Sequence, residues 1–502
     1  MSKLIASLSD LTTEALSAFK QATQSAQAQD MSKFDGLNKA ITQATGLVWY
    51  DLQAPAKNLF PVITPIRNKI PRVSGNGGTA TNWKAVTAIN TSNLRSFVPE
   101  GKRNGAVATT VVDKNASYKS SGLEDTVTFE AELAGKNLED VRATTAQRLL
   151  WAVMIEEELN MLGANNSRAL GTPTAPTVSV VDGGGSIADG TYNVIVVALS
   201  LHGHLASSVA NGVVGQVAVT TVDGQSFNYG GGSSQKSAAT STGVIVNGGD
   251  SRIRASTPVV TGAVAYAWYV GAAGSERLQA ITTINSVELT AALSATNQLA
   301  SAITADNSQN AYAFDGLLYQ AWASGSNAYI SNFATGTPGT GTVLTSDSAG
   351  GITEINTMFR SFWDNYRLSP SMIYVNSQES DNITKKVLTA SAARLNFVTG
   401  GEVPGGIRVK SLLNRFAMGG SVEVPVEIHP YVPSGTLFAM TEQLPYPITN
   451  IPNVFEMKMR RDYYQMEWPL RTRQYETGVY CDGVLAHYFP PSMGIITNIA
   501  NG

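Results

Sequence analysis

The chain of 502 residues has few of the residues from which catalytic and metal sites are usually built. It contains one cysteine and four histidines. A single cysteine excludes an intramolecular disulfide framework, and we interpret Cys481, which lies in a strand-like run, as a small buried residue rather than a catalytic thiol. His202 and His204 form an H-x-H pair with no third ligand nearby, so we interpret them as part of a polar turn rather than a metal site.

Charged residues and long apolar runs are also scarce. Only 15% of the residues are charged and the net charge is −3, which excludes strong general attraction to nucleic acid or to anionic membranes. The most apolar run, 194–201, is too short to span a bilayer. Asp10 and Glu14 interrupt the first twenty residues, which therefore do not resemble a signal peptide. We expect a soluble protein that folds in the cytoplasm.

Sequence motifs of common enzymes are missing as well. The glycine-rich stretch 336–341 is followed neither by Lys-Ser/Thr nor by an immediate helix, so it does not fit a phosphate loop. No Gly-x-Ser-x-Gly elbow occurs. His429 and His487 lie in separate strand contexts, and we interpret both as structural. We therefore predict no enzymatic activity, no metal and no cofactor.

What the chain does contain is an abrupt change of composition over about 172–304. This stretch has four basic residues and six acids, and it is otherwise built of Val, Thr, Ser, Ala and Gly in short runs. Seven short runs with intervening glycine turns predict an antiparallel β-sandwich inserted into an α+β chain. The predicted strands are 177–181, 191–200, 213–222, 243–246, 263–270, 278–284 and 286–290.

The residues before the insertion predict an arm, a hairpin and a long helix. Two helical patterns occupy the first fifty residues, and prolines exclude a long helix after about 51. Strands are expected at 69–73, 79–89, 107–112, 117–119 and 127–133. A helix over 138–162 is expected to begin at the cap Asn137 and to end at Gly163.

The hairpin over about 74–120 is predicted to carry a basic tip with little apolar material. Arg95, Phe97, Lys102 and Arg103 lie in this tip, and they are the candidate residues for contact with another subunit. A tip that cannot form its own core is expected to need a neighbouring surface.

Helices and strands alternate after the insertion. A helix marked by apolar residues from 352 to 366 is expected to end at Pro370, followed by a strand at 372–375 and a helix capped by Ser377. Strict alternation predicts a half-buried strand at 422–428, and Pro425 places it near a sheet edge. The basic residues Lys458, Arg460, Arg461, Arg471 and Arg473 alternate with acids. This pattern favours ion pairing within or between subunits over nucleic-acid binding.

The order of these elements resembles that of a known family. Residues 54–61, 156–160, 365–375, 460–469 and 480–485, together with the arm and the basic-tipped hairpin, resemble the major capsid proteins of tailed bacteriophages, which have the Hong Kong 97-type fold. The motifs at 173–176, 190–194 and 266–270 resemble fibronectin type III and bacterial immunoglobulin-like modules.

The resemblance implies a division into domains. It implies a helical arm at 1–50, an extended loop and peripheral domain with a spine helix at 51–171, and an immunoglobulin-like insertion at 172–304. A mainly axial domain at 305–450 would precede a return to the peripheral domain at 451–502. Some relatives cross-link a loop lysine to a neighbour's asparagine; Lys102 is the corresponding lysine, but no asparagine or acid matches, so this chemistry is not transferred.

The implied function is structural. The chain would assemble with itself into hexamers and pentamers of an icosahedral head, made in the bacterial cytoplasm and located in the virion. Portal, scaffolding and decoration proteins would be partners, and packaged double-stranded DNA would be contacted non-specifically, with no membrane involved. Two alternatives remain open at this point: an encapsulin-like compartment shell, and an extracellular adhesin or carbohydrate-binding protein.

Overall fold

The computed structural model describes residues 61–75, 77–89, 96–105, 109–136, 140–389, 408–417, 421–446 and 453–500. The helical patterns predicted for 1–50, and Arg95 of the predicted tip, lie outside the described residues. Among the residues that are described, no helix is long and apolar enough to cross a membrane. All of them belong to one compact unit with mixed helices and sheets.

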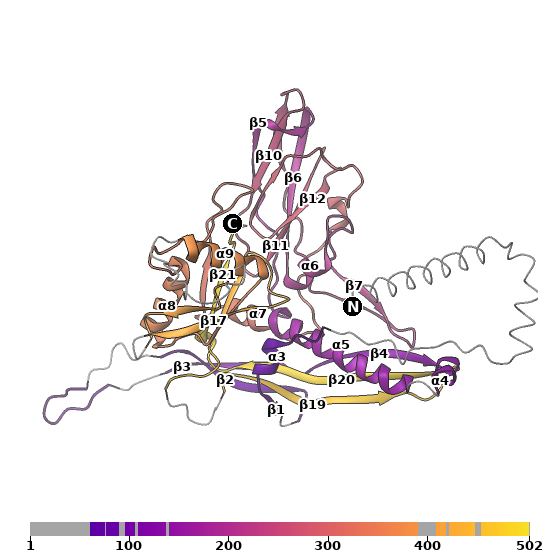
Figure 1. Cartoon of the computed structure of the whole chain (residues 1–502), viewed down its shortest axis with the longest axis vertical. Helices are drawn as coiled ribbons and strands as arrows, with labels where there is room; N and C mark the ends of the chain where they lie inside the picture. The colour runs from indigo at the N-terminus through magenta and orange to yellow at the C-terminus, as the bar shows by residue number, and fades with distance from the viewer. Residues whose placement is uncertain are drawn as a thin grey trace, which may run out of the picture. The chain divides into compact units, whose positions relative to one another are not determined.

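The first sheet is formed by segments from both ends of the chain. Its order is β1-β19-β20-β4, with β1 parallel to β19 and the other pairs antiparallel. The long strands β19 and β20 run side by side, and helix α5 packs against β4 and β20 (Figure 1). The elements are α3 (Pro65–Lys69), β1 (Arg72–Ser74), β4 (Lys119–Thr128), α4 (Phe129–Gly135), α5 (Val141–Gly163), β19 (Phe455–Glu467) and β20 (Gln474–His487).

Helix α5 is the long helix that the sequence predicts, but its start and its buried face differ. The side chain of Asp140, not Asn137, caps it by accepting hydrogen bonds from the backbone N–H groups of Arg142 and Ala143. The spacing of apolar residues in 138–162 predicts a buried stripe that includes Ile155, but Ile155 is only partly buried, whereas Glu157 and Glu158 are buried. The buried face of α5 therefore includes two acids, which have polar partners elsewhere in the fold.

The strand predicted at 127–133 is wrong beyond its second residue, because the chain turns into α4. Thr128 caps this helix by accepting a hydrogen bond from Ala131 N, and Glu130 and Glu132 lie in the first turn, where the helix dipole favours acids. The strand predicted at 69–73 is also only partly correct. Pro65 begins helix α3, which extends to Lys69 before β1 starts.

The second sheet has six strands and contains much of the main hydrophobic core. Its order is β14-β21-β18-β15-β17-β16, and Phe359 and Phe438 are among its fully buried core residues. The elements are α7 (Leu317–Trp322), β14 (Tyr329–Asn332), α8 (Thr353–Tyr366), β15 (Met372–Val375), α9 (Ser377–Thr389), β16 (Ser411–Asn414), β17 (Val422–Ile428), β18 (Leu437–Met440), η3 (Pro490–Ser492) and β21 (Met493–Thr497).

Helix α8, strand β15 and helix α9 confirm the predicted sequence of elements, with two local corrections. Helix α8 ends because Arg367 adopts a left-handed conformation (φ 54°), not because of Pro370. Ser377 is the first residue of α9 rather than its cap, since Asn376 Oδ1 accepts from Gln378 N at 3.1 Å. Strand β17 lies between β15 and the edge strand β16, and is therefore near the edge, as Pro425 predicts. Pro425 lies opposite Ser411, while Val426 N donates to Lys410 O.

The region 172–304 forms two packed antiparallel sheets with two hydrophobic clusters of their own. One sheet has the order β13-β10-β5 and the other β12-β11-β6-β9, while β7 and β8 form a separate hairpin. The elements are β5 (Thr177–Ile187), β6 (Gly190–Leu199), α6 (Leu201–Ala206), β7 (Val217–Thr220), β8 (Ser226–Tyr229), β9 (Thr240–Ile245), β10 (Ser251–Ser256), β11 (Ala265–Gly271), β12 (Arg277–Thr282), β13 (Ser286–Leu289) and η2 (Ala300–Ala302). We refer to β5, β6 and β9–β13 as the sandwich and to β7–β8 as its arm.

Two strands of this region and one helix were not predicted. Strand β10 alternates small or apolar residues inward with arginines outward, a two-residue period that the sequence does carry. Strand β8 has only four residues and lies near a run of glycines. His202 and His204 belong to helix α6, not to a polar turn; Ser200 caps the helix by accepting from Gly203 N.

The predicted hairpin is a two-stranded ribbon of β2 (Ala80–Ala88) and β3 (Thr110–Ser117). In the part of the chain that the structure describes, β3 pairs only with β2. Among the described strands none extends the ribbon beyond β2 and β3, and only part of it, including the buried Ala85 and Thr87 of β2, is covered by the rest of the chain.

Candidate functional site

The tip of the ribbon is the site that the sequence singles out, and every described residue of 96–105 is exposed. A turn forms where Lys102 N donates to Pro99 O at 3.1 Å, with Gly101 at φ 73°. The side chain of Phe97 is 100% exposed and that of Val98 is 45% exposed. The tip thus presents an aromatic ring and an aliphatic side chain without a core to receive them.

The basic residues of the tip have no acidic partner within the described residues. Neither Lys102 nor Arg103 forms an ion pair there, and both are exposed. Arg95, the third basic candidate, lies outside the described residues. Phe97, Lys102 and Arg103 are therefore brought together on one exposed loop, as the sequence predicts, and they can contact a surface that combines apolar groups with acids.

The root of the ribbon, in contrast, is fastened to the body. Trp83 Nε1 donates to the carbonyl of His487 at 3.0 Å, and Val86 N donates to Tyr488 O at 2.8 Å. Lys458 Nζ lies 6.0 Å from the centre of the Trp83 ring and 5.5 Å from that of Tyr488. These contacts hold the root in place, so that the ribbon projects from a fixed base.

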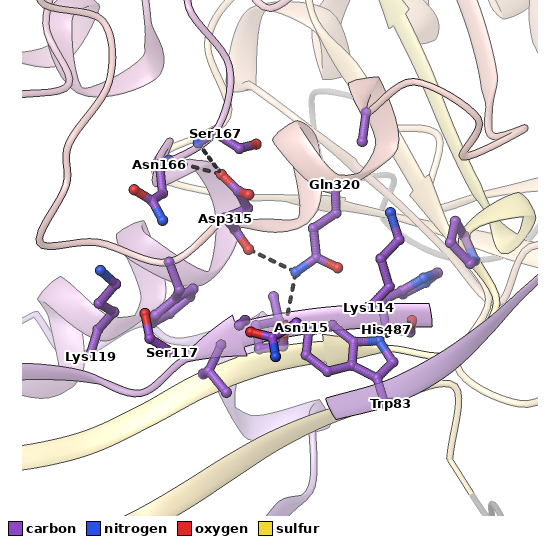
Figure 2. Close-up of a pocket in the computed structure, with 16 residues that line it drawn as sticks. Trp83, Lys114, Asn115, Ser117, Lys119, Asn166, Ser167, Asp315, Gln320 and His487 are labelled. Carbon is purple, nitrogen blue, oxygen red and sulfur yellow. Dashed lines mark hydrogen bonds between the residues drawn. The ribbon is translucent and has the colours of Figure 1, made fainter. Parts of the chain in front are cut away.

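A cavity of about 450 Å³ lies beside this root (Figure 2). Lys114 and Lys119 line one side, and Asp315 and Gln320 line the other. The carboxylate of Asp315 accepts from Asn166 N and Ser167 N, and the Gln320 amide donates to the carbonyls of Asp315 and Leu485. Since most polar groups on the far wall are already paired, the cavity wall is rigid.

His487 lies in the same cavity wall and is fully buried. Burial, reinforced by the charge of Lys114, lowers the pKa of His487 to about 3. Its Nδ1 has no hydrogen-bond partner among the described residues. The imidazole is therefore neutral at physiological pH, which agrees with the structural role predicted for it.

Helix α5 carries a buried acid that the sequence analysis missed. Glu158 Oε1 accepts from Ile66 N at 2.9 Å and from His429 Nε2 at 2.6 Å, while Oε2 accepts from Arg67 N at 2.7 Å. Because Tyr431 N donates to His429 Nδ1, the proton of the neutral ring lies on Nε2. Glu158 thus connects α3, α5 and the residue that follows β17.

Its neighbour Glu157 joins the same helix to the first sheet. Glu157 is paired with Arg67 and Arg72 and also accepts from the hydroxyl of Tyr463. Burial and the charge of Glu157 raise the pKa of Tyr463, so this hydroxyl remains a donor. The acidic run 156–158 suggested a helix but not these partners, which lie up to 306 positions away.

The mixed-sign cluster near the C-terminus forms ion pairs within the chain, as predicted. Arg460 pairs with Asp482 at 2.8 Å and Arg473 with Glu130 at 2.8 Å. Acids of the same cluster pair with basic residues from other elements: Arg72 with Asp462 at 2.6 Å, and Arg142 with Glu467 at 3.1 Å.

The remaining candidates for chemistry form no catalytic or metal site among the described residues. Cys481 is buried in β20, and burial raises the pKa of its thiol to about 12. Burial also lowers the pKa of His202 to about 4 and lowers that of His204. Among the described residues no group of three or more His, Cys, Asp or Glu side chains could hold a metal ion.

No protein-family model and no curated protein matches the chain. Solved structures align at low identity. The cyanophage A-1(L) capsid asymmetric unit is 11% identical, with 91% of this chain and 98% of that chain covered and a TM-score of 0.43. The capsid of the native GTA particle is 9% identical, with coverages of 92% and 99% and a TM-score of 0.42. The holo-SrpI encapsulin complex from Synechococcus elongatus is 8% identical, with coverages of 91% and 95% and a TM-score of 0.36. Alignments at this level do not establish a function, which is inferred below from the elements of the chain itself.

Proposed function

We propose that this protein is a non-enzymatic shell subunit of the Hong Kong 97 type, the major capsid protein of a tailed bacteriophage. The observation that carries the proposal is the ribbon β2–β3, which is fastened at its root and ends in a fully exposed Phe97. An isolated two-stranded ribbon is at best marginally stable in water. A neighbouring copy of the chain is a partner that can cover such a tip at every position of a closed shell.

The other elements fit the same proposal. The sheet β1-β19-β20-β4 with α5 corresponds to the peripheral domain and its spine helix, and the six-stranded sheet corresponds to the axial domain. The sandwich, which has its own apolar clusters, corresponds to an immunoglobulin-like domain inserted at about 172–304. Assembly into hexamers and pentamers places the chain in the virion, with portal, scaffolding and decoration proteins as partners and DNA inside.

Assembly of the purified full-length chain tests this proposal. Co-expression with the scaffolding protein that the proposal requires should yield closed particles in negative-stain images and a fast-sedimenting species. Particles that protect DNA from nuclease indicate a phage head, and particles that contain a protein cargo indicate a compartment shell. A stable monomer or dimer in the presence of the scaffold contradicts the proposal.

A further inference from the structure

The sandwich contacts the rest of the molecule at more places than its two chain connections. One attachment joins it to the end of the six-stranded sheet, and a second, beside the entry of the chain at Arg168, joins it to helix α7. In a third place its arm faces the far end of the four-stranded sheet across a cavity. A domain carried only as a passenger needs no such contacts, because its two chain connections suffice.

The attachment to the six-stranded sheet is a reciprocal pair of buried amides. Asn285 N donates to Asn498 Oδ1 at 2.8 Å, and Asn498 Nδ2 donates to Asn285 Oδ1 at 3.0 Å. The remaining amide hydrogens are also used, by Thr257 O and Thr335 Oγ1 for Asn285 and by Phe333 O for Asn498. Because both side chains are almost fully buried, every one of these bonds is costly to lose.

The conformation around this pair is specific. Asn498 has φ 63°, a left-handed conformation that asparagine tolerates better than most residues. Next to it, Gly339 N donates to Ser286 Oγ at 3.0 Å, and a Cβ at Gly339 would lie 2.4 Å from the Cβ of Glu288. The turn between β12 and β13 and the segment after β21 therefore form one closely packed joint.

The second attachment fastens the turn that precedes β11. Tyr319 of α7 is fully buried, and its hydroxyl donates to Gly262 O at 3.0 Å. Arg168 donates from Nε to Thr261 O at 3.0 Å and from Nη1 to Trp322 O at 2.8 Å, so that it ties this turn to the end of α7.

The third attachment is open and weaker. The turn of the arm, with Thr221 and Asp223, lies across a cavity of about 200 Å³ from Trp468 and Arg471 at the end of the four-stranded sheet. A hydrogen bond from Thr221 and, to a lesser degree, the charge of Arg471 hold the pKa of Asp223 below its usual range. Behind this turn, Phe227 and Tyr312 meet edge to face, with ring centres 5.4 Å apart.

We propose that the sandwich is a clasp that fixes the six-stranded and four-stranded sheets of one subunit relative to each other. If the proposed shell function is correct, the clasp also limits the range of curvature with which neighbouring subunits join. The buried amide joint is its permanent end, and the exposed arm is the end that can open.

Hydrogen exchange of the full-length chain tests the clasp directly. In Asn285→Ala, amide exchange at 333–341 and 493–499 should accelerate about tenfold, because Asn498 Nδ2 loses the acceptor Asn285 Oδ1 and Thr335 Oγ1 loses the donor Asn285 Nδ2, while the backbone N–H of residue 285 remains. The matched control is Asn228→Ala, which removes the same atoms from an exposed position on β8 and should change nothing. Unchanged exchange at both segments in Asn285→Ala overturns the proposal.

A second set of variants affects only exposed residues and therefore does not endanger folding. Arg471→Glu should accelerate exchange of the arm, 217–229, about twofold to fivefold, because it places a fourth acid beside Asp223, Glu124 and Glu476. Combining it with Asp223→Lys should restore the original rate. If Arg471→Glu leaves the exchange rate of 217–229 unchanged, the third attachment is refuted.

Particle size separates this inference from the proposed function. Asn285→Ala particles should show a broader distribution of diameters than wild-type or Asn228→Ala particles. If wild-type protein forms no particles, the shell function fails, while the exchange measurements still decide the clasp. If all three proteins form identical particles, the sandwich does not limit curvature.

Discussion

The sandwich and the ribbon are both additions to the two main sheets, and they differ in how their apolar side chains are buried. The sandwich closes two sheets over residues such as Trp268 and Val196, which are fully buried. The ribbon has two strands and an uncovered tip in which Phe97 is 100% exposed. One element thus obtains its stability from its own core, whereas the tip of the other can be covered only by a partner.

The difference has a consequence for how substitutions act. In the sandwich, a change should appear in the unfolding of the isolated subunit. At the tip, a change should appear only where subunits meet.

The largest effect is expected for Trp268→Ala in β11. The indole is fully buried and donates from Nε1 to Thr282 Oγ1, so its removal leaves a cavity and a Thr282 hydroxyl that keeps only its hydrogen bond to Ile284 O. We expect a loss of about 3–5 kcal/mol, measured by urea unfolding followed by circular dichroism. Val244→Ala on the same sheet is the control, and its 75% exposed side chain should cost less than about 0.5 kcal/mol. Equal effects of the two substitutions would contradict a cored sandwich.

The next largest loss of stability is expected for Glu158→Gln in α5, because this buried carboxylate accepts three hydrogen bonds from other segments of the chain. The substitution keeps the shape of the side chain. It replaces one carboxylate oxygen by an NH2 group, which would face a hydrogen-bond donor such as His429 Nε2 or Arg67 N. We expect a loss of about 2–4 kcal/mol in the same assay. Glu100→Gln at the exposed tip is the matched control and should leave the free energy of unfolding unchanged. If Glu158→Gln also leaves it unchanged, the three donors find other acceptors.

A smaller and pH-dependent effect is expected for His202→Gln in α6. Because the pKa in the folded protein is about 4, against about 6.5 for an unperturbed histidine, the unfolded state binds a proton that the folded state does not. Above pH 6.5 the ring is neutral in both states and His202 does not lower the free energy of unfolding. As the pH falls from 6.5 toward 4, the unfolded state gains a proton and the free energy of unfolding decreases. The variant should therefore flatten the dependence of unfolding free energy on pH by about 1.4 kcal/mol per unit in this range. Parallel curves for wild type and variant between pH 6.5 and 4 would show that His202 is not buried as a neutral ring.

The smallest effect on the subunit is expected at the tip. Phe97→Ala combined with Arg95→Glu should change the free energy of unfolding by less than about 0.5 kcal/mol, because Phe97 contacts no core. The same variant should impair assembly, since a modest contact repeated around each ring is multiplied by avidity. The measurement is particle yield in negative-stain images. A clear loss of subunit stability with normal particles would instead mean that the tip packs on its own chain.

Local sequence signals predict the elements whose identity depends on neighbouring residues. The apolar period around Phe359 predicts α8, the Ser377 start predicts α9, and alternation predicts β17. The exposure of Phe97, Lys102 and Arg103 could also be predicted, because the tip contains too little apolar material to bury itself. In each case the relevant physics acts over a few residues.

Contacts between distant segments decide the remainder. Glu158 is buried only because Ile66, Arg67 and His429, up to 271 positions away, supply its donors. No pattern within α5 can show that these donors are present. Their hydrogen bonds override the expectation that an acid faces solvent.

The joint of Asn285 and Asn498 has the same origin, since 213 positions separate two ordinary loop asparagines. The sequence by itself therefore determined the long helices α5, α8 and α9, most strands, the inserted β region and the exposed tip, because propensity and periodicity are local. Only the tertiary structure decided which buried polar groups meet and how the sandwich is attached. Those choices depend on satisfying each buried donor and acceptor across the whole fold.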